Sequence, residues 1–206
     1  MGFEVKMPEQ KIEVPEYWNI IFLAGEINES TSIDVSQKLL SIDMINKNLE
    51  RPEPINLIIN SGGGLLSSAW QICDMMDFID SPVYTIGLGE IASAALMIFM
   101  NGKKGHRSLS SRCSIMSHQY SSGIVGKHSD LLAVRREQDF NHDKILKHYK
   151  ESTGLSEKII IKNLLKEHDV WLSPEEAIKF KMADKVVYSN KQVKKESNGR
   201  KTSIHK

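Results

Sequence analysis

The stretch VYTIGLGEIASAALMIFM, residues 83–100, decides the fold class, because it passes from a strand pattern to a helix pattern at one serine. The apolar run 83–86 favours a buried strand, and the Ala, Leu and Met residues after Ser93 favour a helix. Ser93 is predicted as the first residue of that helix. Unpaired backbone N–H groups and the helix dipole favour developing negative charge at such a position.

Three other segments supply groups that suit a reactive serine. His118 follows the strand-like run 113–116, and Asp169 comes just before the apolar run 170–172. The sequence NSGGG, residues 60–64, ends another apolar run and can place bare backbone N–H groups beside the serine. Together they offer a nucleophile, a base, an orienting carboxylate and an oxyanion hole, which is the set that acyl transfer requires.

Strand and helix patterns alternate along the chain, which indicates an α/β domain. Strands are expected at residues 19–23, 55–59 and 83–86. Helices are expected at 30–49 with Ser30 or Thr31 as the cap, around 69–79 after a glycine turn, and from Ser93 to the pair Asn101-Gly102.

The second half of the chain contains two further helix signals. Residues 129–152 form a long, charged helical pattern, which is too polar to be wholly buried. The sequence SPEE, residues 173–176, is a capping box with proline at the first helical position. A helix therefore begins shortly after Asp169, which places this carboxylate on a short connection at an element boundary.

Composition is that of one globular domain, with 40% hydrophobic and 26% charged residues among 206. No apolar run approaches the roughly 20 residues that span a bilayer, and the first 19 residues lack the apolar core of a signal peptide, so a cytoplasmic location without membrane contact is expected. Cys73 and Cys113 are expected to be buried free thiols. Neither the cysteines nor the histidines have metal-site spacing, so no metal or cofactor is expected.

Charge is unevenly distributed. Residues 189–206 carry six Lys or Arg against one Glu, although the whole chain has a net charge of only +1. This tail lacks interleaved aromatic residues and any nucleic-acid-binding signature, so a solvated tail is expected and nucleic acid is not an expected partner.

Beyond these patterns, the chain resembles the proteolytic subunits of the Clp protease family (ClpP) over roughly residues 18–188. The resemblance rests on the order Ser, His, Asp and on five segments: residues 19–27, 55–64, 92–93, 116–119 and 169–177. It implies the α/β ClpP/crotonase-like fold, built of repeated strand–turn–helix units with a projecting handle helix.

The resemblance also implies how the chain is divided. Residues 1–18 are a divergent N-terminal segment, and 19–188 form a ClpP-like serine protease domain with a handle at about 121–152. The basic tail 189–206 follows.

The activity implied by the resemblance is that of a self-compartmentalising serine endopeptidase, which cuts unfolded polypeptides inside stacked rings. The expected partners are other copies of the chain, in a heptamer stacked as a tetradecamer, and an AAA+ unfoldase of the ClpX or ClpA type. The divergent N-terminus makes the unfoldase expectation weaker than the active-site one.

Site residues follow from the same resemblance. Ser93, His118 and Asp169 are the expected triad, and the backbone N–H groups of Gly64 and Ala94 are the expected oxyanion hole. An extended edge that includes Gly123, Ile124, Val125 and Gly126 is expected to bind the substrate backbone.

The orienting carboxylate has an alternative. The interval before Asp169 is about two residues longer than the family pattern, and counting from His118 favours Glu167. The local frame Asp-x-aromatic-Leu-Ser favours Asp169. We choose Asp169, because insertions usually fall in the segments that connect helices and strands. The direction of a side chain close to the following helix cap is fixed by that cap.

Gly62 and Tyr120 stand where the family usually has proline, which bears on substrate preference. Other functions remain open. A phage-type capsid-maturation protease of related fold and a non-catalytic Clp ring subunit are the main alternatives. A crotonase-like acyl-CoA enzyme would not need Ser93 and His118 together.

Overall fold

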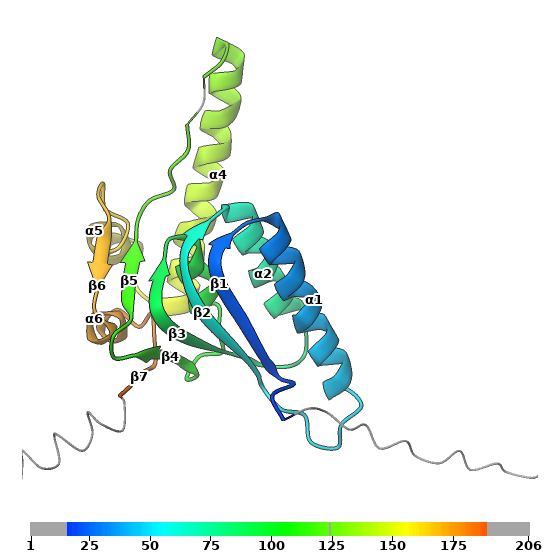
Figure 1. Ribbon diagram of the computed structural model, residues 1–206. Coiled ribbons are helices and arrows are strands. Elements are labelled where there is room, and N and C mark those ends of the chain that lie inside the picture. The colour runs from blue at the N-terminus through cyan, green and yellow to red at the C-terminus, as the bar shows by residue number, and fades with distance from the viewer. Residues whose placement is uncertain (1–15, 124, 189–206) are drawn as a thin grey trace, which may run out of the picture.

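The computed structural model describes residues 16–123 and 125–188, and its centre is a seven-stranded sheet (Figure 1). The strands are β1 (Ile20–Ile27), β2 (Ile55–Gly64), β3 (Val83–Ala92), β4 (Arg107–Ser110), β5 (Ser114–Ser117), β6 (Val170–Leu172) and β7 (Lys185–Val187). The helices are α1 (Glu29–Asn46), α2 (Leu66–Phe78), α3 (Ala94–Met100), α4 (His128–Thr153), α5 (Glu157–Asn163) and α6 (Pro174–Lys179).

The sheet is mostly parallel, as the alternation of strand and helix patterns predicted. Its order is β1-β2-β3-β4-β7 with every pair parallel, and β5 pairs in parallel with the second half of β3. The exception is β6, which runs antiparallel to β5. Figure 1 shows α1 and α2 lying together along one face of the sheet. The carboxyl ends of β1, β2 and β3 therefore meet at one edge.

Two of the central strands are longer than predicted. The apolar runs suggested that they end at Ile59 and Ile86, but β2 continues to Gly64 and β3 to Ala92. Pairing extends them, because Ser61 aligns with Ile91 of β3. The predicted glycine turn is thus the end of a strand.

The start of α1 also differs from the prediction. Asn28 is the cap instead of Ser30 or Thr31, and its side chain accepts a hydrogen bond of 3.0 Å from the Thr31 N–H. Asn28 has the extended backbone that a cap requires, whereas the Thr31 hydroxyl donates to the carbonyl of Glu26.

The helix α3 is the most deeply placed helix, with all of its residues buried. It packs against β2, β3 and α2. Thr85 donates to the Phe99 carbonyl at 2.9 Å, which ties β3 to the end of α3. The helix ends at Asn101, as predicted from the Asn101-Gly102 pair.

The long helix α4 projects from the body, as the family resemblance implied (Figure 1). Its C-terminal part is anchored in the core, where Ile145, Leu146 and Tyr149 are buried. Leu131 and Leu132, near its other end, are exposed. Gly154 ends the helix in a left-handed conformation.

Some predictions concern segments that lie outside the described residues. These are the basic tail 189–206 and most of the N-terminal segment 1–18. Within the described ranges, no helix combines the length and the apolar character needed to cross a bilayer.

An ion pair between the buried Arg107 and Asp184 connects β4 with elements of the second half of the chain. The Arg107 guanidinium is 3% exposed and bonds both carboxylate oxygens of Asp184, at 2.9 and 2.8 Å. It also donates to the carbonyls of Ser152 and Lys181, which joins β4 to α4 and to the turn after α6. Burial alone would raise the pKa of Asp184, but hydrogen bonds from Arg107 and the Gly105 N–H hold it below its ordinary value.

Asp184→Asn should therefore lower the free energy of unfolding by about 3 kcal/mol at neutral pH, because a buried guanidinium loses its counter-charge. Urea unfolding measures this effect. Since the native pKa is lowered, the stabilisation is present above the ordinary aspartate pKa and is lost as the pH falls through the native value. Parent and variant should therefore converge in strong acid. The exposed pair Asp34–Lys38 is the control, and Asp34→Asn should cost less than about 1 kcal/mol.

Candidate active site

Ser93 occupies a strained turn between β3 and α3. It is the N-cap of α3 with φ of 54° and ψ of −123°, and not the first helical residue as predicted. Its N–H donates to the Met116 carbonyl on β5, and its carbonyl accepts from Leu96, both at 3.0 Å. Such a backbone costs a non-glycine residue roughly 1–3 kcal/mol and presents the side chain at the end of the sheet.

His118 reaches Ser93 because their strands are paired. Ala92 aligns with Met116, so the residues that follow these two strands emerge at the same edge. The Nε2 atom of His118 lies 2.7 Å from the Oγ atom of Ser93. The structure thus brings together two residues that are 25 positions apart in the sequence.

Asp169 lies on the other side of the imidazole. Ser117 aligns with Val170 in the antiparallel pair β5–β6, so His118 and Asp169 follow as neighbours across that pair. The His118 Nδ1 and Asp169 Oδ1 atoms are 3.9 Å apart, which is longer than a hydrogen bond, and the Asp169 side chain is 57% exposed. Glu167 is exposed, and among the described residues Asp169 supplies the carboxylate within 4.0 Å of the His118 ring.

A buried pair of hydroxyl groups supports the backbone of His118. Ser117 donates to the Leu164 carbonyl at 2.7 Å, so the Tyr149 hydroxyl, also 2.7 Å away, donates its hydrogen to Ser117. Burial raises the pKa of Tyr149 to about 12, which keeps this hydroxyl neutral. The residue before His118 is thereby fixed to both α4 and the segment after α5.

The backbone N–H groups that were expected to form the oxyanion hole belong to Ala94 and Gly64. Ala94 is the first residue of α3, so its N–H is among those that the helix does not bond. Gly64 aligns with Ile27 of β1, but the N–H that donates to Ile27, at 2.8 Å, belongs to Leu65. In a parallel ladder the N–H of Gly64 then points away from β1. Gly64 and Ala94 both line the pocket that contains Ser93 and His118.

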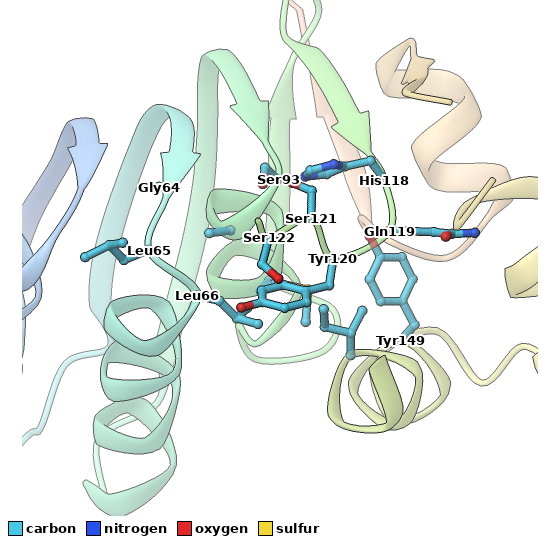
Figure 2. A pocket seen from close by; sticks show the side chains of 13 residues that line it. Gly64, Leu65, Leu66, Ser93, His118, Gln119, Tyr120, Ser121, Ser122 and Tyr149 are labelled. Carbon is cyan, nitrogen blue, oxygen red and sulfur yellow. Dashed lines mark hydrogen bonds between the residues drawn. The ribbon is translucent and has the colours of Figure 1, made fainter. Parts of the chain in front are cut away.

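This pocket has a volume of about 310 Å³ and a largely apolar wall (Figure 2). The larger apolar side chains are Leu65, which precedes α2, Leu66 of α2, Met97 of α3, and Ile145 and Tyr149 of α4. The sequence patterns did not assign these residues to a pocket. Met97 could have been inferred, because it lies one helical turn after Ser93, whereas the others depend on how separate helices pack.

The predicted substrate-binding edge is exposed and lies outside this pocket. Gly123, Val125 and Gly126 are exposed, and Ile124 lies outside the described residues. Residues 121–123 and 125–127 do not form a strand in the described backbone.

The two cysteines are buried free thiols, as predicted. Burial raises the pKa of Cys113 to about 11 and raises that of Cys73 further. Neither is therefore a thiolate near neutral pH. Within residues 16–123 and 125–188, no cluster of three or more His, Cys, Asp or Glu side chains could hold a metal ion.

Comparisons with known proteins identify the family. The family model described as Clp protease matches residues 12–190. The ATP-dependent Clp protease proteolytic subunit 2 of Treponema denticola is 33% identical over 173 residues, which cover 84% of each protein. The solved structure of a ClpP1 mutant from Listeria monocytogenes is 28% identical and superposes with a TM-score of 0.74, covering 84% of this chain and 94% of the other. The fold is therefore the ClpP/crotonase-like fold that the sequence suggested, and the chain belongs to the Clp protease family as a protease of the ClpP type.

Proposed function

We propose that the chain is a serine endopeptidase, with Ser93 as nucleophile, His118 as general base and Asp169 as the residue that orients the imidazole. The observation that carries this proposal is the 2.7 Å contact between Ser93 Oγ and His118 Nε2 at a strained turn that opens into a pocket. A serine hydroxyl is a weak nucleophile unless a base lies within hydrogen-bond reach.

The reaction needs only these groups and water. Ser93 Oγ attacks the carbonyl carbon of the peptide bond while its proton passes to His118 Nε2. The C–N bond then breaks, and His118 returns the proton to the leaving nitrogen, so that an ester on Ser93 remains. Water then attacks the ester carbon while its proton passes to the same imidazole. The C–O bond to Ser93 breaks, and His118 returns the proton to Ser93 Oγ as the carboxylic acid product leaves.

The negative oxygen formed by this attack is assigned to the N–H groups of Gly64 and Ala94. The close approach of β2 to the serine supports the assignment. A Cβ atom added to Gly63 would lie 2.8 Å from both the Ser93 Cβ and the Ala92 carbonyl oxygen, so only glycine lets the two strands come this near. Backbone donors held in this way need no reorganisation as charge develops.

Asp169 would act by closing its 3.9 Å separation from His118. Catalytic hydrogen bonds are often long without substrate and tighten when it binds. A carboxylate at Nδ1 fixes the tautomer in which Nε2 can accept the Ser93 proton, and it stabilises the imidazolium that results.

The pocket wall supports a preference for an apolar side chain before the cut. Leu66, Met97 and Ile145 offer no hydrogen-bonding side-chain groups, and the Tyr149 hydroxyl is taken by Ser117. For the substrate backbone we assign the segment 123–126, of which Gly123, Val125 and Gly126 are exposed and where strand-like pairing would be largely independent of sequence.

We further infer that copies of the chain enclose these sites in stacked rings and that a Clp ATPase feeds them unfolded polypeptide in the cytoplasm. The projecting part of α4 supports an assembly, because Leu131, Leu132 and Phe140 are exposed there. Apolar side chains on a helix that stands away from its own core gain burial only from another molecule.

Ser93→Ala should leave the fold intact and lower peptide hydrolysis by roughly 10³–10⁶-fold, because the hydroxyl is the attacking group. A fluorogenic peptide with an apolar residue before the cut measures turnover. A serine-directed fluorophosphonate should label the parent at Ser93 and leave the variant unlabelled. Full turnover in a pure Ser93→Ala sample would contradict the assignment.

The orienting residue is resolved by a matched pair in the same assay. Asp169→Asn should slow the parent strongly but have little effect on Ser93→Ala, because triad members act as a unit. Glu167→Gln is the control and should retain the parent rate. The reverse result would assign the role to Glu167.

Gly63→Ala should lower the rate of Ser93 labelling by about 100-fold, because the new methyl group displaces the serine by a fraction of an ångström or more. Gly154→Ala is the control. It also lies at positive φ, but nothing is within 4 Å of its added Cβ. Both variants should be less stable than the parent, as urea unfolding would show. An unchanged labelling rate in Gly63→Ala would show that this close approach does not position the nucleophile.

The double variant Leu131→Glu/Leu132→Glu should form a smaller assembly than the parent. Two new charges would have to be desolvated before this surface could be buried. Sedimentation velocity measures the change, and peptide turnover should fall with it. Ile161→Glu is the control, since Ile161 is 41% exposed and Leu131 is 44% exposed. Equal sedimentation of the double variant and the parent would remove α4 from the interface.

A further inference from the structure

A short segment separates the candidate active-site pocket from a second cavity. Residues 119–122, which we call the partition segment, follow His118 and line both spaces. The second cavity has a volume of about 390 Å³, and the side chains facing it from α4 are Arg135, Gln138, Asp139 and His142. One side of the partition segment is thus largely apolar and the other is polar.

Both ends of the partition segment are held by short hydrogen bonds. Gln119 donates to the Leu165 carbonyl at 2.9 Å, and Ser122 accepts from Gln138 of α4 at 2.7 Å. Tyr120 is held differently, because its hydroxyl donates to Glu137 over 3.4 Å, a long contact. Glu137 also accepts a hydrogen bond from Asn141, so it is positioned without help from Tyr120.

The Tyr120 side chain suits the boundary between the two cavities. Its ring is half-buried and packs against the core, while its hydroxyl donates to Glu137 of α4. Tyrosine is well fitted to such a place because it combines an apolar body with a polar end. In Figure 2 the ring extends from the partition segment towards the side of the pocket where Leu66 lies.

We propose that Tyr120 determines the largest side chain that the pocket accepts before the cut. This inference rests on the proposed function. Tyr120 lines both the pocket that contains Ser93 and the polar cavity, and we take its half-buried ring as the wall between them. A side chain of the size of leucine gains contact with this wall. A tryptophan side chain has to displace the ring, because the apolar side chains of α2, α3 and α4 that line the pocket belong to packed helices.

Tyr120→Ala should therefore relax the size limit by joining the two cavities. Two fluorogenic peptides that differ only in the residue before the cut, Leu in one and Trp in the other, would measure this size limit. The ratio of kcat/KM for the Trp peptide to that for the Leu peptide should rise on the order of tenfold, the scale of discrimination by pocket shape. Tyr120→Phe keeps the wall and should keep the parent ratio. Tyr120→Trp thickens the wall and should lower the ratio.

Labelling of Ser93 by the fluorophosphonate gives the fraction of active sites in each sample, so a loss of folded protein does not alter the ratio. An unchanged ratio in both Tyr120→Ala and Tyr120→Trp, with Ser93 still labelled, overturns the role of Tyr120 and leaves the proposed function intact. A parent that cleaves neither peptide and shows no labelled Ser93 overturns the proposed function, and this inference with it.

Discussion

Parallel pairing between β3 and β5 is the interaction on which the candidate site depends. The first half of β3 pairs with β4 and the second half with β5, so β3 alone connects the main sheet to the strand that leads to His118. The bond from the Ser93 N–H to the Met116 carbonyl continues this pairing by one residue into the turn. Without that register, Ser93 and His118 would leave the sheet at different heights.

The free-energy cost of the Ser93 backbone conformation is small compared with the stabilisation from the buried side chains of α3. A positive φ at a serine costs roughly 1–3 kcal/mol, whereas burying one large apolar side chain contributes about 1.5–3 kcal/mol. The helix that Ser93 caps buries Leu96, Met97, Ile98, Phe99 and Met100, all of which are at most 4% exposed. The apolar content of α3 thus over-determines the turn. The hydrophobic stretch that follows Ser93 is therefore what holds the strained backbone of this residue.

Local patterns predicted the parts of the structure that local physics decides. The alternation of strands and helices, the end of α3 at Asn101 and the capping box at Ser173 all follow from neighbouring residues. The extension of β2 and β3 was missed, because it depends on pairing partners that are distant in sequence. Tyr149 and Tyr120 could not be linked to the pocket for the same reason. The triad candidates came from short frames that resemble a known family, and their distances required the structure.

The three candidate residues differ in how firmly their strands are held, and the distances follow that order. Ser93 ends a central strand of ten residues and His118 follows a strand paired on both sides, and these two side chains are in hydrogen-bond contact. Asp169 precedes β6, which has three residues and pairs only with β5 in the described part of the chain. Short edge strands contribute few hydrogen bonds and open at low cost. The 3.9 Å gap between His118 and Asp169 therefore lies where the sheet resists displacement least. Of the distances within the site, it is the one that a bound substrate or a neighbouring copy can change with the smallest loss of packing.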